Sequence, residues 1–374
     1  MRVIIAGDFY PSGKVSEFIS QGSYSCVLSD VKIITDQADF SIVNLECPAT
    51  ESLVPISKVG PALKCGVEAL DALKYVGFDC VTLANNHIND YGAQGVIDTL
   101  DSLKAKGFDY VGAGKNRSEA SKTLFKEISG SRLAVINCCE REFSIADPCT
   151  PGAFELDPVV QIERIRQAKK CADHVLMIIH GGYERCSLPS PRMVRTYRAF
   201  IDAGADAVIN HHQHCCSGFE IYEGKPIIYG IGNFCFEALA TEDESWNKGV
   251  IAELDFGKGP DPGFRLIPFT QCLESPSVRV MGEKDAERFL AELAVLSAII
   301  QDEERLDKEY AAFLSKVSPT YQGVFNYKYR LLRYLSRRGL IKSSLSAKER
   351  LMLMDYIGCD SHRDALMSFL EGKK

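Results

Sequence analysis

Short apolar runs that alternate with helical patterns constrain the fold of this chain more than any other feature. The runs rich in β-branched residues, which we expect to be strands, are residues 3–6, 40–44, 80–83, 132–137, 175–179 and 207–209. Helical periodicity is clearest at residues 68–76 and 95–106, and each of these segments is followed by a glycine that can end a helix. This alternation predicts an α/β (α+β sandwich) fold, with β-sheets flanked by helices.

The pattern changes after residue 216. Four shorter apolar runs, at residues 219–222, 226–231, 250–256 and 264–269, are joined by tight turns and are expected to be antiparallel strands. Four helical segments follow, at residues 283–297, 302–316, 324–338 and 346–370. We therefore predict a main domain over residues 1–275 and an α-helical C-terminal region over residues 276–374.

Composition narrows the class of protein. Of 374 residues, 46% are hydrophobic and 25% are charged, which is typical of a globular protein with a sizeable core. The net charge of −7 argues against nucleic acid as a partner. The apolar run at the N-terminus is too short for a signal peptide, and no stretch is long enough to cross a bilayer, so we expect a cytoplasmic protein. The 14 cysteines form no C-x-x-C pair, so a zinc–thiolate site is not expected.

Polar clusters stand at the ends of five expected strands. They are Gly7-Asp8, Asn44-Leu45-Glu46, Asn85-Asn86-His87, His180-Gly181-Gly182 and the run from Asn210 to His214. Five of the seven histidines lie in these clusters. Because the carboxyl ends of parallel strands face one crevice, side chains this far apart in sequence can converge there.

The residue types indicate metal chemistry. Carboxylates, carboxamides and imidazoles together suit Mn, Fe, Zn or Co better than Ca, which prefers oxygen ligands alone. A carboxylate such as Glu46 can bridge two metals ~3.5–4 Å apart, and such a pair activates water and holds a phosphoryl oxygen. A histidine outside the metal ligands could protonate the leaving oxygen.

Each cluster also has a structural interpretation. Asp8 alone could cap a turn, Glu46 could form an ion pair, and His180 could be a hydrogen-bonded core histidine. The histidines at 211–214 are harder to explain in this way, because a polar run that ends a buried strand needs partners. Taken together, the clusters favour a metal site.

Longer motifs carry a family resemblance. They are residues 83–92 (LANNHINDYG), 112–116 (GAGKN), 44–46, 204–209, 211–214, 224–226 and 232–234. Over roughly residues 1–256 the chain resembles the CapA family of capsule and poly-γ-glutamate synthesis proteins, a branch of the calcineurin-like metallophosphoesterases. The resemblance implies that metallophosphoesterase fold, to which this chain adds a C-terminal helical extension.

The resemblance also implies roles for individual residues. Asp8 matches a ligand of the first metal, Glu46 the bridging carboxylate, Asn86 and His180 ligands of the second metal, His212 and His214 the paired histidines that reach different metals, and His87 the catalytic acid. His211 could be the inner ligand in place of His212. Asp90 could orient His87 or cap the following helix. The residues expected to contact substrate or to support the ligands are Asn44, Asn85, His211, Glu184 and Asn233.

The chain departs from the family pattern at several positions. Phe9-Tyr10 follows Asp8 where metallophosphoesterases carry Asp-x-His, so one imidazole is missing and the first metal is expected to bind weakly. Asn210 replaces a glycine, and Gln213 stands where proline is common. Gly181-Gly182 replaces an aromatic–glycine pair, which is expected to open space near the metals.

A basic stretch lies in the C-terminal region. Residues 327–350 contain eight Lys or Arg and one Glu, with an apolar stripe among them. This stretch could contact an anionic membrane, a polyprenyl-phosphate lipid or an acidic partner. A helix packed on the main domain with a solvated basic face is the favoured interpretation.

Three functions follow from these observations. The first is a dinuclear metallophosphoesterase linked to capsule, poly-γ-glutamate or exopolysaccharide biosynthesis, which would act on a phosphorylated or polyanionic small molecule or polymer. The second is a non-catalytic assembly or binding factor for capsule-synthesis enzymes, which the missing first-strand histidine supports. The third is a metal-dependent amidohydrolase on polyglutamate-like substrates, with Arg185 and Arg192 holding carboxylates.

Overall fold

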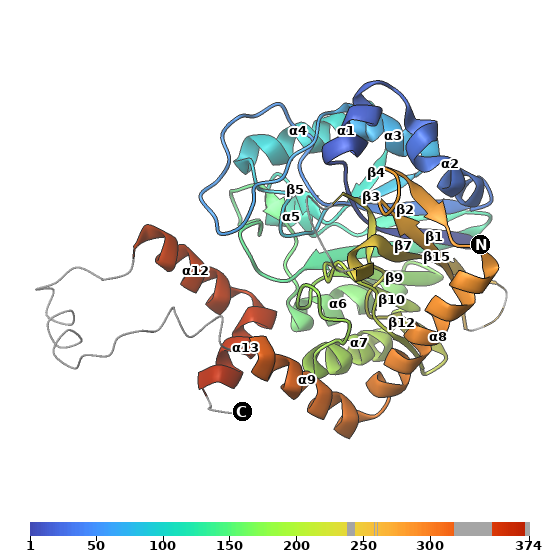
Figure 1. The fold of residues 1–374 in the computed structure, drawn as a ribbon, viewed down its shortest axis with the longest axis vertical. Helices are drawn as coiled ribbons and strands as arrows, with labels where there is room; N and C mark the ends of the chain where they lie inside the picture. The colour runs from blue at the N-terminus through green and yellow to red at the C-terminus, as the bar shows by residue number, and fades with distance from the viewer. Residues whose placement is uncertain (238–243, 258, 260, 318–345, 371–374) are drawn as a thin grey trace, which may run out of the picture.

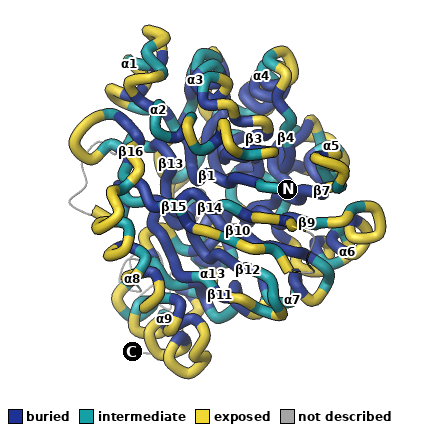
Figure 2. The backbone as a smooth tube through the Cα atoms, turned by 90° about the vertical axis from the view of Figure 1, so that its right-hand side faces the viewer, coloured by how far each residue is buried: buried dark blue, intermediate teal, exposed yellow. Residues whose placement is uncertain are grey.

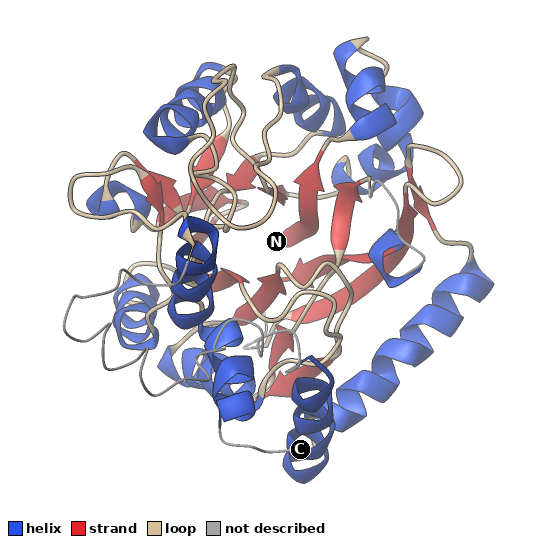
Figure 3. Cartoon of the chain, turned by 60° about the vertical axis from the view of Figure 1, so that its left-hand side comes forward, coloured by secondary structure: helices blue, strands red, loops and turns tan. Residues whose placement is uncertain are grey.

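Two β-sheets pack face to face, and helices cover both outer faces (Figures 1 and 3). The computed structural model describes residues 1–237, 244–257, 259, 261–317 and 346–370. The first sheet has the order β16-β15-β14-β1-β2-β3-β4, with β13 also paired to β1, and the second has the order β11-β12-β10-β9-β7-β6. The predicted α/β sandwich is confirmed.

The strand bounds are as follows. The first sheet comprises β1 (Arg2–Tyr10), β2 (Phe40–Leu45), β3 (Cys80–Thr82), β4 (Asp109–Val111), β13 (Asn233–Phe236), β14 (Lys248–Asp255), β15 (Gly263–Gln271) and β16 (Val278–Val280). The second comprises β6 (Leu124–Ile128), β7 (Ser131–Cys139), β9 (His174–His180), β10 (Ala207–His211), β11 (Phe219–Tyr222) and β12 (Lys225–Ile228). A small third sheet pairs β5 (Ala113–Gly114) with β8 (Gly152–Ala153).

The helices divide between the two outer faces. The first sheet is covered by α1 (Gly13–Ser20), α2 (Tyr24–Thr35), α3 (Glu68–Val76) and α4 (Gly92–Ala105), and the second by α6 (Pro158–Lys169) and α7 (Pro191–Ala203). The others are α5 (Arg117–Ala120), η1 (Glu244–Asn247), α8 (Glu283–Ile300), α9 (Glu303–Val317), α12 (Ala347–Gly358) and α13 (Asp360–Leu370).

The alternation of side chains along β1 explains the layers. Val3 and Ile5 lie in the core between the two sheets, whereas Ile4 and Ala6 face the core under the helices. A strand buried on both faces needs an uninterrupted apolar run, which is what the sequence has here. Figure 2 shows the result, with buried strands at the centre and exposed residues mainly on the outer helices.

The strands that the sequence predicts are confirmed, with small shifts at their ends. α3 has the predicted bounds, and α4 begins at Gly92 rather than at residue 95.

The single helix predicted over residues 346–370 is wrong. Helix α12 ends at Gly358 and Cys359 is extended, because glycine is a poor helix former and Asp360 starts a new helix. The predicted helix at residues 324–338, and residues 327–345 of the basic stretch, lie outside the described residues.

The C-terminal helices pack on the two-sheet body. Helix α8 lies against both β11 and β15, and its Ser297 accepts a hydrogen bond from the backbone N–H of Phe219 at 2.9 Å. Helix α13 reaches the end of β7, where the Ser361 hydroxyl donates to Glu140 at 2.6 Å. Among the described helices, none has the combination of length and apolar composition that a bilayer span needs.

The strand register brings the polar clusters to one end of the sandwich. Asp8 in β1 is paired with Asn44 in β2 on one side and with Asn233 in β13 on the other. In the facing sheet, His211 of β10 is paired with His180 of β9. These strands run parallel, so their carboxyl ends lie at the same edge, as the sequence indicates.

Gly7 permits a close backbone approach beside Asp8. A Cβ atom at this position would lie 2.0 Å from the carbonyl oxygen of Gly232, a distance that no side chain can adopt without backbone movement.

We expect Gly7→Ala to lower the free energy of unfolding by ~2–4 kcal/mol in urea denaturation. Gly282→Ala is the control, because its Cβ would meet nothing within 4 Å, and it should cost no more than ~1 kcal/mol, for the loss of a favourable N-cap residue of α8. Equal effects of the two substitutions would contradict this explanation.

Candidate metal centre

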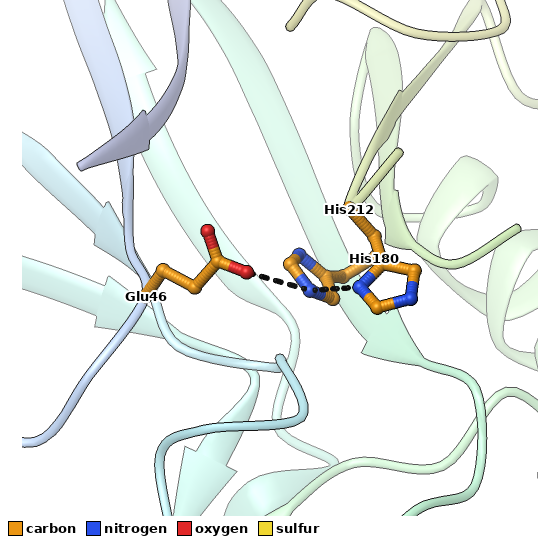
Figure 4. Close-up of side chains that lie close together, drawn as sticks. All are labelled: Glu46, His180 and His212. Carbon is orange, nitrogen blue, oxygen red and sulfur yellow. Dashed lines mark hydrogen bonds and ion pairs between the residues drawn. The ribbon is translucent and has the colours of Figure 1, made fainter. Parts of the chain in front are cut away.

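Three of the polar clusters bring a carboxylate and two imidazoles to one buried point. The Glu46 Oε1 atom lies 3.5 Å from His180 Nε2 and 3.7 Å from His214 Nε2. Figure 4 shows Glu46 pointing toward His180, with His212 beside it. Side chains from the ends of β2, β9 and β10 therefore converge, although they are separated by up to 168 residues in sequence, the interval from Glu46 to His214.

Glu46 belongs to two groups that could each hold a cation. One comprises Glu46, His180 and His212, and the other comprises Asp8, Glu46 and His214; within each group the donor atoms lie within 4.8 Å of one another. All of these residues are buried, and neither group includes a cysteine. A carboxylate common to two ligand groups is suited to lie between two cations.

The group around His180 also includes a carboxamide. His180 Nε2 lies 3.0 Å from the Asn86 Oδ1 atom and 3.0 Å from His212 Nδ1. The amide oxygen of Asn86 offers only lone pairs, and of the two ring nitrogens that face each other at least one carries no proton. The three ligand atoms, one each from Asn86, His180 and His212, therefore gather beside the Glu46 carboxylate. Such a mixed oxygen and nitrogen set is suited to binding a divalent cation of the Mn, Fe or Zn type.

The group around Asp8 is held by a dense set of contacts. The Asp8 Oδ1 atom accepts a hydrogen bond from Asn44 at 2.7 Å and lies 3.2 Å from His211 Nδ1. Its Oδ2 atom accepts from the His212 backbone N–H at 3.2 Å and lies 3.7 Å from His214 Nδ1. Burial alone would raise the pKa of Asp8, but the His211 hydrogen bond and the nearby imidazoles outweigh it and hold the pKa well below its usual range.

Glu46 has the opposite electrostatic environment. Both of its carboxylate oxygens are buried, and neither has a hydrogen-bond partner among the described residues. Burial, followed by the charges of Asp8 and Glu184, raises its pKa well above the usual value. Burial likewise lowers the pKa of His212 to about 4, so its ring is neutral at neutral pH. A cation would supply the charge that Glu46 lacks and would bind neutral imidazoles, so these residues fit the metals that the sequence suggests.

The backbone around the last histidines is strained. His212 has φ 89° and His214 has φ 55°, both in the left-handed region that residues other than glycine rarely adopt. Such outliers persist where the surrounding structure imposes them, and they concentrate at functional sites. Here the strain turns His212 and His214 toward the two different groups.

The expected supporting residues divide by position. Asn233 Oδ1 lies 2.8 Å from His214 Nδ1, which leaves His214 Nε2 free to face Glu46. Asn44 contacts Asp8, as given above. Asn85 instead holds the loop: its amide donates to the Leu45 carbonyl, and its Oδ1 atom accepts from the backbone N–H groups of His87 and Ile88. The structure brings His212 into the Glu46–His180 group and places His211 against Asp8, with a buried Nε2 atom that has no hydrogen-bond partner in the described structure.

The ring of His87 is held in place by the charged side chains of Asp90 and Lys58. Its Nδ1 atom lies 2.6 Å from Asp90 Oδ2, and Asp90 also accepts from Lys58 Nζ at 2.6 Å and from the Leu63 N–H at 2.7 Å. Asp90 therefore contacts His87 and does not cap α4, whose N-cap residue is Tyr91. Burial, together with the Lys58 charge, lowers the pKa of His87 despite the opposing effect of Asp90. Nε2 is the ring nitrogen left for other partners.

Several residues at the edge of the site have no sequence signal. Lys58 lies in a long loop without periodicity, and Glu142, whose Oε1 atom is 3.8 Å from His212 Nε2, lies in the irregular segment that follows β7. Burial, with Asp355 and Glu184 nearby, raises the pKa of Glu142 to about 8. The expected Glu184 is exposed, and the ionisable side chains that act most strongly on it are His214, His212 and His87, so it lies at the mouth of the site.

The expected opening beside Gly181 is wrong. A side chain at this position would meet the Glu140 side chain at 2.8 Å, so that volume is filled by a residue from the end of β7. Glu140 also binds Arg192 at 2.8 Å, and Arg192 contacts Asp364 of α13 at 3.2 Å. Arg192 is therefore engaged in joining the body to the C-terminal helices.

Comparison with known proteins identifies the family. Residues 2–238 match the family described as bacterial capsule synthesis protein PGA_cap. The chain belongs to the PGA_cap family. This confirms the CapA resemblance that the asparagine–histidine motif indicates.

Two relatives from Bacillus, both named CapA, are similar to the chain. It is 32% identical over 270 residues to the PGA biosynthesis protein CapA of Bacillus subtilis, covering 70% of this chain and 69% of that protein. It is 30% identical over 257 residues to the capsule biosynthesis protein CapA of Bacillus anthracis, covering 66% of this chain and 61% of that protein. A solved structure of a 5′-nucleotidase precursor from Thermus thermophilus aligns with a TM-score of 0.43 and 12% identity, over 80% of this chain and 60% of that one.

Proposed function

We propose that this PGA_cap protein is a dinuclear metal-dependent phosphoester hydrolase that serves capsule, poly-γ-glutamate or related polymer synthesis. The observation that carries the proposal is the fully buried Glu46 carboxylate, which is common to two ligand groups and has no hydrogen-bond partner among the described residues. Asp8, Glu46 and His214 would hold one cation, and Glu46, Asn86, His180 and His212 the other. The link to polymer synthesis rests on the names of the Bacillus relatives.

The chemistry divides between the cations and the chain. Two divalent cations in these positions would supply Lewis acidity toward a phosphoryl oxygen and make a nearby water more acidic. His87 would move a proton at Nε2 to the leaving oxygen, because Asp90 holds Nδ1 and orients the ring. The negative charge of a bound phosphoester favours the protonated ring and so opposes the effect of burial on its pKa.

The missing first-strand histidine does not leave Asp8 without an imidazole. Tyr10 occupies that sequence position and packs edge-on against Phe236, with ring centroids 4.9 Å apart. His211, from β10 in the other sheet, instead lies 3.2 Å from Asp8. This contact favours the catalytic function over a non-catalytic assembly factor, whose main support is the missing histidine.

Metal-dependent hydrolysis of a generic aryl phosphate tests the proposal. We expect the metal-stripped protein to be inactive and to recover activity when Mn²⁺ or Zn²⁺ is added, and His180→Ala to recover less than about 1% of the wild-type rate. Folding of the variant is checked by circular dichroism. A rate that is unchanged by chelation, by metal addition and by His180→Ala would contradict the proposal.

A further inference from the structure

Arg185 stands at the mouth of the metal centre. The neighbouring residue Glu184 lies close enough to His214, His212 and His87 to interact with them electrostatically. The backbone N–H of Arg185 donates to the carbonyl of Gln213 at 2.7 Å, and Gln213 stands between the two strained histidines in the sequence. The side chain of Arg185 is exposed. No carboxylate of the described residues lies within ion-pair distance of its guanidinium, whereas Lys58 and Arg192 are engaged by Asp90 and by Glu140.

The guanidinium is held over the chain's one tryptophan. The Arg185 Cζ atom lies 5.4 Å from the Trp246 ring centroid, which is within the range of a cation–π contact. The indole itself is fixed, because its Nε1–H donates to the Phe236 carbonyl at 2.8 Å and only 8% of the residue is exposed. A cation–π contact uses the face of the aromatic ring and leaves the N–H donors of the arginine for other acceptors.

Trp246 connects this arginine to the metal ligands. Its ring centroid lies 4.8 Å from that of His214, whose Nε2 atom faces Glu46. Two contacts, Arg185 with Trp246 and Trp246 with His214, therefore connect the guanidinium to the candidate metal ligands. Arg185 also has φ 59°, a left-handed conformation that is unfavourable for arginine, so the local structure imposes its position.

We propose that Arg185, seated on Trp246, binds a second anionic group of the substrate and so determines specificity. This inference rests on the proposed phosphoester hydrolysis at the metal centre and names its substrate class. The substrate carries a carboxylate or phosphate on its leaving group, beyond the phosphoryl group that is cleaved. Arginine is suited to both anions because its planar fork can donate two parallel hydrogen bonds.

Paired substrates test this assignment by kinetics. The probes are an aryl phosphate with a glutaryl side chain, the same molecule with that carboxylate as a methyl ester, and an analogue in which a phosphonate replaces the carboxylate. We expect Arg185→Met to raise KM about tenfold for the two substrates with a charged tail and less than twofold for the methyl ester. The kcat values should stay within about twofold of wild type. Whichever charged tail loses more affinity identifies the anion. Arg185→Lys should fall between wild type and Arg185→Met, and Arg166→Met, an exposed arginine on α6, is the matched control.

Trp246 fluorescence tests the same contact without catalysis. Because the chain has one tryptophan, we expect its emission to change on titration with a hydrolysis-resistant phosphonate that carries the glutaryl tail, and Arg185→Met to weaken the apparent affinity about tenfold. If the protein hydrolyses no phosphoester but shows this change, the hydrolase proposal fails and the anion site stands. Equal KM effects on acid, phosphonate and ester, or equal titrations of wild type and Arg185→Met, would overturn the assignment of Arg185.

Discussion

Glu46→Gln should weaken the binding of both cations at once. We expect an affinity loss greater than the ~10–100-fold that follows removal of a supporting partner, because a carboxylate common to both ligand groups is lost. His214→Ala should weaken mainly the cation beside Asp8, and His180→Ala mainly the cation beside Asn86. Metal content by mass spectrometry and titration calorimetry measure these differences.

The same substitution should have an unusual effect on stability. In the metal-free protein the Glu46 carboxyl is buried without a hydrogen-bond partner in the described structure, so glutamine should leave the thermal unfolding temperature unchanged or raise it. With metal present, the variant should lose most of the stabilisation that wild type gains from binding. Glu140→Gln is the control, since this buried glutamate binds Arg192 and Ser361 and should lose stability while both cations still bind. A strongly destabilised metal-free Glu46→Gln would contradict the account.

His87→Ala should reduce kcat by ~10²–10⁴ and leave the metal content unchanged. The reason is that His87 contacts Asp90 and Lys58 and belongs to neither ligand group, so its loss removes proton transfer alone. Asp90→Asn should show a smaller loss in the same direction, because it removes the charge that orients the ring. Steady-state kinetics with an aryl phosphate measure both effects.

A histidine distant from the centre is the control for these variants. His174→Ala replaces a residue at the start of β9 that packs on Phe256 with ring centroids 4.7 Å apart, and it should keep the wild-type rate. An unchanged kcat in His87→Ala, or loss of cations from it, would assign His87 a different role.

The sequence supports much of the fold because local pattern and tertiary structure agree there. Runs such as residues 3–6 are apolar on both faces, and the strands they predict are buried on both faces. The polar clusters at strand ends were predictable for a different reason, because a histidine run such as 211–214 at the end of a buried apolar strand needs partners. Parallel pairing then places Asp8, Glu46, His180 and His214 at one edge of the sandwich.

What the sequence did not predict depends on contacts between distant segments. Lys58 and Trp246 lie in segments without periodicity, and their roles depend on the neighbours Asp90 and His214. The expected opening at Gly181 was wrong because the Glu140 side chain, which fills it, comes from another strand. Whether Asp90 caps a helix or orients His87 likewise required the position of the loop that carries Lys58 and Leu63.

Diffraction from crystals soaked in Mn²⁺, recorded for anomalous scattering, would examine the metal centre most directly. We expect two peaks ~3.5–4 Å apart, one on each side of the Glu46 carboxylate, with His214 at one and His180 at the other. No peak at Glu46, or a single ion bound away from these histidines, would contradict the dinuclear centre and the hydrolase built on it.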